Sequence, residues 1–291
     1  AQPGANNLFA YPAQSNFSGV QHSLAWIEHA QQKGWDVLLD AAAFVPTNRL
    51  DLGAVHPDFV CLSFYKMFGY PTGVGALLAR RSALAKLHRP WFAGGTITVA
   101  SVQGDRYFLH LGAEGFEDGT LNYLTLPAVE IGLRHIAGIG YDMIHMRAAC
   151  LAGWLLEQLS GLRHSNGMPV VKVYGPLETE MRGGTITMNF FDPRGHFVDH
   201  LRVEERANRK NISIRTGCFC NPGGGELALG LSAEELSTCF ALKPRMEYTD
   251  FRRCIDDKST GAVRISVGLV SNFADCYALA AFAREFVDKG A

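Results

Sequence analysis

Two residues with the chemistry of a carbonyl-cofactor site each stand at or just beyond the end of a short apolar run. Asp40 closes the run 37–40, and Lys66 follows the run 59–63 by three residues. A lysine amine that can lose its proton forms a Schiff base with a carbonyl cofactor such as pyridoxal phosphate. A carboxylate beside the ring keeps the pyridine nitrogen of that cofactor charged, so that the ring accepts electrons. The pair therefore predicts a Schiff-base cofactor site.

Strand and helix patterns alternate around these two residues. We expect strands at 8–12, 37–40, 59–63 and 75–79, and helices at about 20–33 and 80–88. This alternation favours an α/β fold with a mixed, mostly parallel sheet and helices on both faces. Ligands of such sheets bind where the carboxyl ends of strands meet loops. Asp40 and Lys66 both fall at such ends.

A long helical stretch over about 128–159, interrupted at Gly138 and Gly140, leads to a second region. There we expect strands at 170–174, 185–190, 212–215 and 263–267, and helices at 196–210 and 272–288. We therefore predict a large cofactor-binding domain over 1–150 and a smaller α+β domain over 151–291.

The composition narrows the classes of partner. Apolar residues make up 47% of the 291 residues, and the formal net charge is −1, so no broad attraction to nucleic acid or to an anionic membrane is expected. Small molecules or another protein surface are the expected partners. We expect no metal site. Without a signal peptide, a membrane span or a small disulfide framework, the chain is expected to be cytoplasmic, with packed thiols at Cys61, Cys150, Cys239, Cys254 and Cys276.

Six motifs occur in order along almost the whole chain. They are Tyr11-Pro-Ala-Gln-Ser-Asn-Phe-Ser-Gly19, Leu38-Leu-Asp-Ala-Ala-Ala43, Ser63-Phe-Tyr-Lys-Met-Phe-Gly-Tyr-Pro-Thr-Gly-Val-Gly75, Phe116-Glu-Asp-Gly-Thr-Leu-Asn122, Arg215-Thr-Gly-Cys-Phe-Cys-Asn-Pro-Gly223 and Val263-Arg-Ile-Ser-Val-Gly268. Together they resemble the pyridoxal-phosphate domain of molybdenum cofactor sulfurases, within the class V aminotransferase and cysteine desulfurase superfamily. The resemblance implies a fold-type I transferase that binds pyridoxal 5'-phosphate.

The resemblance also implies roles in holding this cofactor. Lys66 would form the Schiff base, and Asp40 would pair with the pyridinium nitrogen. Asn16 resembles the asparagine that donates to the phenolic oxygen of the cofactor, and Ser63 resembles a phosphate-binding serine. Thr120 resembles a threonine that binds the phosphate of the neighbouring subunit, which implies a homodimer.

A second set of implied roles concerns the substrate, L-cysteine or another small amino acid. Arg264 resembles the arginine that holds its α-carboxylate, a task suited to a flat bidentate fork. Cys220 resembles the thiolate that takes the substrate sulfur as a persulfide and leaves alanine, with Cys218 as the second candidate. The glycine-rich run 221–225 suits a mobile loop. A protein or a cofactor would then accept the sulfur.

Two positions depart from the broader desulfurase pattern. Tyr65 stands where many desulfurases have histidine, and Ala43 stands where they have glutamine. Both changes fit the cofactor-sulfurase branch. They also leave open a lyase, decarboxylase or racemase of another amino acid, in which Cys220 is a bystander.

Simpler structural roles also remain open for the single residues. Asp40 could merely cap a following helix. Cys218 and Cys220 could be packed thiols or two metal ligands, and Arg264 could serve an ion pair.

The start of the sequence gives one more expectation. The strand pattern begins at Leu8, and the part that would carry the ring-stacking residue in the family is not found. We expect further upstream sequence to pack beside residues 8–80, on the same gene product or on a separate chain. The sequence up to Ala291 contains no segment that resembles the C-terminal domain of the longer family members. A non-catalytic scaffold chain that has lost the cofactor therefore stays the third hypothesis.

Overall fold

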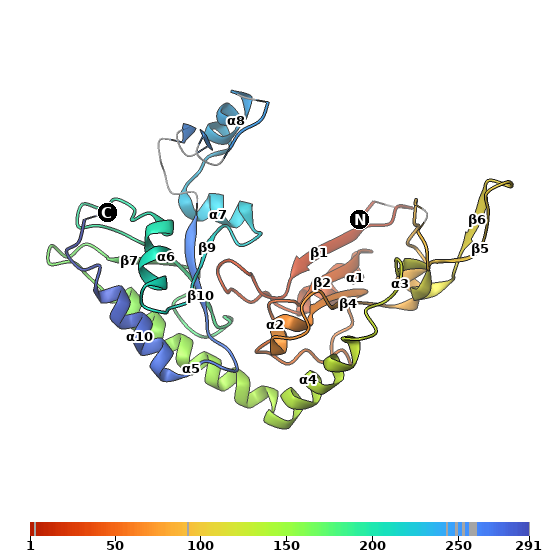
Figure 1. The fold of residues 1–291 in the computed structure, drawn as a ribbon, viewed down its shortest axis with the longest axis horizontal. Coiled ribbons are helices and arrows are strands. Elements are labelled where there is room, and N and C mark those ends of the chain that lie inside the picture. Colours follow the sequence, from red (N-terminus) through yellow and green to blue (C-terminus); the bar gives the residue numbers. More distant parts are fainter. Residues whose placement is uncertain are drawn as a thin grey trace. The chain divides into compact units, whose positions relative to one another are not determined.

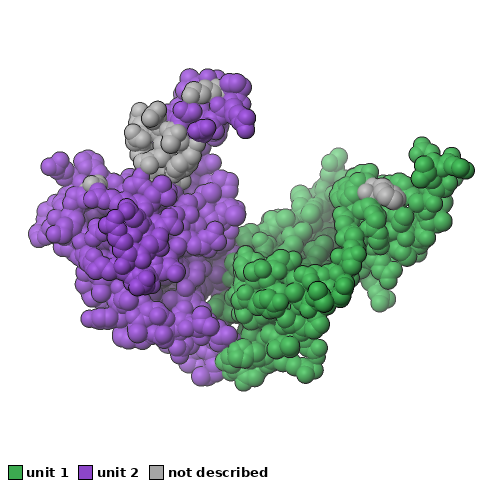
Figure 2. Space-filling view, viewed as in Figure 1, with its two compact units in different colours: residues 1–13, 23–141 green, residues 14–22, 142–291 purple. Residues whose placement is uncertain are grey.

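The computed structural model describes residues 1–2, 4–91, 93–242, 244–247, 250–251, 254–255 and 261–290. These residues form two compact units (Figure 2). Unit 1 comprises 1–13 and 23–141, and unit 2 comprises 14–22 and 142–291. The domain limits at 1–150 and 151–291 stay a prediction.

Unit 1 is built on a four-stranded sheet. Its strands, in the order in which they lie side by side, are β1 (Leu8–Pro12), β2 (Asp36–Asp40), β3 (Phe59–Ser63) and β4 (Gly75–Ala79) (Figure 1). The first three are parallel and β4 is antiparallel to β3. Val37 and Leu39 are fully buried in β2, because alternate side chains of a strand point to the same face. The predicted mixed, mostly parallel sheet is confirmed.

The helices of unit 1 begin and end differently from the prediction. They are α1 (Ala25–Gln32), α2 (Phe64–Phe68), α3 (Arg81–Leu84), the 3-10 helix η1 (Gly112–Phe116) and α4 (Leu126–Ile139). α1 begins at residue 25 instead of 20, because residues 14–22 belong to unit 2. α3 ends at Leu84 instead of residue 88. The hairpin of β5 (Ile97–Ser101) and β6 (Arg106–Leu109) was not predicted.

The long helical stretch is confirmed as two consecutive helices. Gly138 lies inside α4, and the break falls at Gly140, whose φ of +92° is costly for a residue with a Cβ. α5 (Tyr141–Ser160) follows at once.

Unit 2 has an antiparallel sheet. Its strands, in spatial order, are β7 (Val171–Tyr174), β8 (Thr185–Phe190), β10 (Ala262–Ser266) and β9 (Arg215–Gly217). Its helices besides α5 are α6 (His200–Asn208), α7 (Pro222–Leu229), α8 (Ala233–Ala241) and α10 (Phe273–Arg284). The predicted strand at 212–215 was misplaced: Ile212 packs against the core, and pairing with β10 begins at Arg215.

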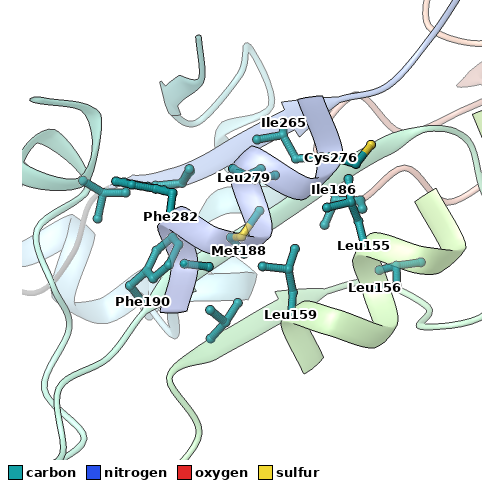
Figure 3. Packing of buried hydrophobic residues seen from close by; sticks show 14 of the residues in the cluster. Leu155, Leu156, Leu159, Ile186, Met188, Phe190, Ile265, Cys276, Leu279 and Phe282 are labelled. Carbon is teal, nitrogen blue, oxygen red and sulfur yellow. The ribbon is translucent and has the colours of Figure 1, made fainter. Parts of the chain in front are cut away.

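The core of unit 2 lies between its sheet and the helices α5 and α10 (Figure 3). α5 contributes Leu155 and Leu159, and α10 contributes Leu279 and Phe282. Against them pack the inward side chains of β8 and β10, which are Ile186, Met188, Phe190, Val263 and Ile265. This packing fixes β10, the strand that carries Arg264.

Two of the cysteines expected to be packed thiols are instead bonded to each other. Cys239 in α8 and Cys254 form a disulfide, while the other five cysteines are free. The expected packing of Cys150 is also wrong, because this thiol is exposed. The sequence alone gave no pairing, because the 15-residue spacing has no framework around it.

No helix among the described residues has the length and apolar character that crossing a membrane requires.

Two glycines of α4 give a matched test of how this helix packs. A Cβ on buried Gly132 would lie 2.4 Å from the ring of Phe68 in α2, whereas a Cβ on exposed Gly138 would meet nothing within 4 Å. We expect Gly132→Ala to lower the free energy of unfolding by about 1–3 kcal/mol through overpacking. Gly138→Ala should raise it by about 0.5–1 kcal/mol through helix propensity. Urea denaturation measures both, and equal effects of the two variants would contradict this close contact.

Candidate active site

The parallel strands β2 and β3 bring Asp40 and Ser63 to one edge of the unit 1 sheet. Their register pairs Asp40 with Cys61, so both strands run out at this edge. The Asp40 side chain is exposed, and its Oδ1 accepts a hydrogen bond from the Ala42 backbone N–H at 3.0 Å. Asp40 thus caps the following turn with one oxygen. No basic side chain in the described ranges forms an ion pair with it.

Lys66 is presented by the short helix α2, which starts directly after β3. Ser63 takes the N-cap position with extended backbone, but its hydroxyl makes no capping hydrogen bond. Lys66 is exposed, while Met67 beside it is buried. Gly75 allows β4 to return alongside, because a Cβ there would lie 2.7 Å from the Leu62 carbonyl oxygen. The predicted cofactor groups Asp40, Ser63 and Lys66 therefore share one end of adjacent strands.

Cys61, in the same strand, is a poor nucleophile. Burial, and secondarily the nearby Asp40 carboxylate, raise the pKa of the Cys61 thiol. Because its pKa is raised, this thiol stays protonated at neutral pH, whereas the thiolate is the reactive form of cysteine.

Thr120 lies elsewhere in unit 1, in an exposed turn held by a residue that the sequence analysis did not single out. The side chain of Arg89 is 3% exposed and forms a salt bridge with Asp118. Gly119, with φ +69°, donates its N–H to the Gly94 carbonyl at 2.7 Å. The turn therefore presents Thr120 to solvent. Its predicted role toward a second subunit remains a prediction.

Unit 2 brings together Asn16, Arg264 and the cysteine loop. The Asn16 side-chain amide donates to the Phe219 carbonyl at 2.6 Å, and its Oδ1 accepts from Asn221 Nδ2 at 3.3 Å. Arg264 Nη1 donates to the Asn16 backbone carbonyl at 2.8 Å. The Arg264 guanidinium carbon lies 4.6 Å above the centre of the Phe219 ring. Three segments far apart in the sequence thus meet.

The thiols of this loop are open to solvent. Cys218 and Cys220 are exposed and free, and the Phe219 side chain between them is buried. The Phe219 ring packs at 5.6 Å from that of Phe17, which in turn lies 6.0 Å from that of Tyr174. Burial raises the pKa of Tyr174 to about 12, so its hydroxyl stays neutral. A packed-thiol role does not fit the exposed Cys218 and Cys220.

The loop 14–22 that carries Asn16 is fixed to unit 2 by close backbone contacts. Gly19 has φ +76°, and a Cβ there would lie 2.4 Å from the Thr185 carbonyl oxygen. Val20 forms a β-bridge with Arg182. Arg182 is buried, which lowers its pKa to about 10, and it donates to the Thr185 carbonyl at 2.9 Å. Only glycine suits position 19.

Within the described ranges, no group of three or more His, Cys, Asp or Glu side chains is placed to hold a metal ion.

The chain is similar to known proteins over nearly its whole length. The sequence pattern of the family described as aminotransferase class-V matches residues 4–279. Molybdenum cofactor sulfurase of Bos taurus is 41% identical over 293 residues, covering 95% of this chain and 33% of that protein. Molybdenum cofactor sulfurase of Homo sapiens is 39% identical over 292 residues, covering 95% of this chain and 32% of that protein. The chain thus spans about a third of the length of these curated relatives.

A solved structure shares the fold. The apo cysteine desulfurase from Thermococcus onnurineus NA1 matches 97% of this chain and 60% of its own chain, with a TM-score of 0.73 and 23% identity. This likeness confirms the expected fold-type I architecture. Since the family pattern spans most of the sequence and the relatives are about 40% identical, this chain belongs to the aminotransferase class-V family.

Proposed function

We propose that this chain is the pyridoxal-phosphate domain of a cysteine desulfurase of the molybdenum cofactor sulfurase type. It would take sulfur from L-cysteine as a persulfide on Cys220 and release alanine. The observation that carries the proposal is the exposed thiol loop of Cys220, tied through Phe219 to Asn16 and Arg264. The names of the relatives support the same reaction class.

The residues at the sheet edge of unit 1 fit pyridoxal phosphate. Lys66 offers an exposed amine and Asp40 an oxygen beyond the one that caps its turn. The Ser63 hydroxyl, which makes no capping bond, suits a phosphate oxygen. When bound, the cofactor draws electrons away from the α-carbon of an amino acid.

Lys66 and Arg264 would act on the substrate. A lysine amine near the α-carbon can accept and return the α-proton, which is ordinary general acid–base catalysis. Arg264 would hold the α-carboxylate with the edge of its guanidinium, since the face is occupied by the Phe219 ring.

Cys220 would complete the sulfur transfer. Its thiolate attacks the sulfur of the substrate, so an S–S bond forms while the bond from sulfur to the β-carbon breaks. The electron pair of the broken bond stays with carbon, and a proton completes the methyl group of alanine. The net reaction converts cysteine and the Cys220 thiol into alanine and a Cys220 persulfide, without an external oxidant.

The acceptor and the compartment belong to this proposal as well. An exposed persulfide can reach an acceptor, and the relatives make molybdenum cofactor the first acceptor to test. The carrier thiol must stay reduced, so we propose the cytoplasm as its compartment, although a disulfide such as Cys239–Cys254 is rare there.

The first prediction concerns cofactor attachment. We expect the purified protein to show a visible absorbance band with added pyridoxal phosphate, and Lys66→Ala to lose it, because the variant lacks the amine that would form the Schiff base. Lys33→Ala, which removes another exposed lysine of unit 1, should keep the band. A wild-type protein without any band would favour the scaffold hypothesis.

The second prediction concerns the carrier thiol. Cys220→Ser should lower sulfide release from L-cysteine at least ~100-fold while the absorbance band stays, because a hydroxyl is a poor nucleophile at neutral pH. Cys150→Ser, which removes another exposed thiol of unit 2, is the control. Activity lost only in Cys218→Ser would move the role to that residue. Activity kept in the Cys218/Cys220 double variant would favour a lyase or racemase.

The third prediction concerns a homodimer. If Thr120 binds the phosphate held by a second subunit, Thr120→Ala should weaken cofactor affinity about 10-fold through the lost charge-assisted hydrogen bond. Thr98→Ala, at another exposed threonine of unit 1, should not. Light scattering of the loaded protein should give at least a dimer, and a fully loaded monomer would contradict this.

A further inference from the structure

The loop that carries the two exposed thiols is anchored by the residue between them. The Phe219 side chain is only 5% exposed, although Cys218 and Cys220 on either side are open to solvent. A buried aromatic ring between two exposed neighbours acts as a fixed point, because pulling it out would expose a large apolar surface.

The backbone of this loop needs such an anchor. Phe219 and Cys220 have φ values of +56° and +59°, directly after Gly217 and Cys218. Side chains with a Cβ disfavour this left-handed region, and two such residues in succession persist only where surrounding contacts hold them. The conformation of the thiol loop therefore depends on the contacts of Phe219.

Those contacts hold both the ring and the carbonyl of Phe219. The ring packs 5.6 Å from that of Phe17, and the guanidinium carbon of Arg264 lies 4.6 Å above its centre. The carbonyl accepts the 2.6 Å hydrogen bond from Asn16 Nδ2. Arg264 in turn donates to the Asn16 backbone at 2.8 Å, which closes a ring of contacts among the three residues.

Two of these three residues have duties in the proposed function. A guanidinium carries its five N–H donors in its plane, so stacking on its face uses none of them. The Asn16 amide has two hydrogens, and the Phe219 carbonyl uses one. Phe219 therefore contacts both groups while using only one of their hydrogen-bond donors.

We propose that Phe219 is a positioning residue for sulfur transfer, and this rests on the proposed function. Its ring and carbonyl tie the thiol loop to Arg264 and Asn16, so that the groups that bind the amino acid and the cofactor also fix Cys218 and Cys220. Phe219 touches neither substrate nor cofactor and acts through these neighbours.

Three variants distinguish the effect of the aromatic ring of Phe219 from that of its apolar volume. Phe219→Leu keeps an apolar side chain but offers no π-face to Arg264, and Phe219→Tyr keeps that face. Phe197→Leu is the control, because Phe197 pairs with Phe191 at 4.7 Å elsewhere in unit 2. Hydrogen exchange of the peptide 216–222, without cofactor, should be roughly 3- to 30-fold faster in Phe219→Leu. Exchange in Phe219→Tyr and Phe197→Leu should stay near that of the wild type.

A double variant tests whether Arg264 belongs to the same anchor. Arg264→Lys keeps the charge but loses the flat guanidinium, so it should also speed exchange of the peptide 216–222. The effects of Phe219→Leu and Arg264→Lys should be less than additive in the double variant, because both changes remove the contact between the Phe219 ring and the guanidinium. Three results would contradict the proposal that Phe219 anchors this loop. They are additive effects in the double variant, unchanged exchange in Phe219→Leu, and exchange that is equally faster in β7, β8 and β10.

The kinetic arm tests positioning itself. With pyridoxal phosphate and L-cysteine, Phe219→Leu should raise KM and lower kcat, each roughly 3- to 30-fold, and Phe219→Tyr should restore most of both. Wild-type kinetics in a Phe219→Leu protein whose loop exchanges fast would overturn the positioning role. A wild-type protein that does not release sulfur from L-cysteine would instead contradict the proposed function, and with it the positioning role. The exchange measurements would still decide whether Phe219 anchors the loop.

Discussion

The hydrogen bond from the Asn16 amide to the Phe219 carbonyl joins positions 203 residues apart, and the chemistry proposed for unit 2 depends on it. It is supported from both sides. The loop 14–22 is held against β8 by Gly19, where no side chain fits. Arg264 is held in β10, whose Ile265 faces the buried core. Because the thiol loop has a disfavoured backbone, these fixed elements determine where its cysteines lie.

Strand register imposes the corresponding constraint on unit 1. Pairing of β2 with β3 sets Asp40 opposite Cys61, and a slip by one residue would turn every side chain of the strand to the other face. The position of Lys66 is set by α2, a helix of five residues that lies directly between β3 and Gly69 and has no room to shift. The close approach of Gly132 to Phe68 then packs α4 onto this helix. Lys66, the proposed attachment lysine, is thus placed by backbone geometry.

The sequence predicted elements best where one short-range signal decides them. The apolar runs before Asp40 and Lys66 became β2 and β3, and the break between the long helices fell at Gly140 because of its positive φ. β9 was misplaced, since a three-residue strand depends on its partner in β10 rather than on its own pattern.

Long-range contacts explain what the sequence analysis missed in the site. Phe219 reads as an ordinary apolar residue between two cysteines, and its importance follows from Asn16 and Arg264, more than 40 residues away in either direction. Arg89 likewise gains its role only by meeting Asp118. The pairing of Cys239 with Cys254 depends on how α8 is placed. The family resemblance did assign Asn16, Cys220 and Arg264 to a common site, and unit 2 brings these three together.

A single-turnover experiment with L-cysteine tests the central claim, that Cys220 takes the sulfur and alanine leaves. The protein would be loaded with pyridoxal phosphate, mixed with L-cysteine without reductant, and analysed for amino-acid products and for sulfur added to the peptide that contains Cys220. We expect alanine in an amount equal to the persulfide found on Cys220. Pyruvate and ammonia in place of alanine, with no sulfur on the loop, would contradict it.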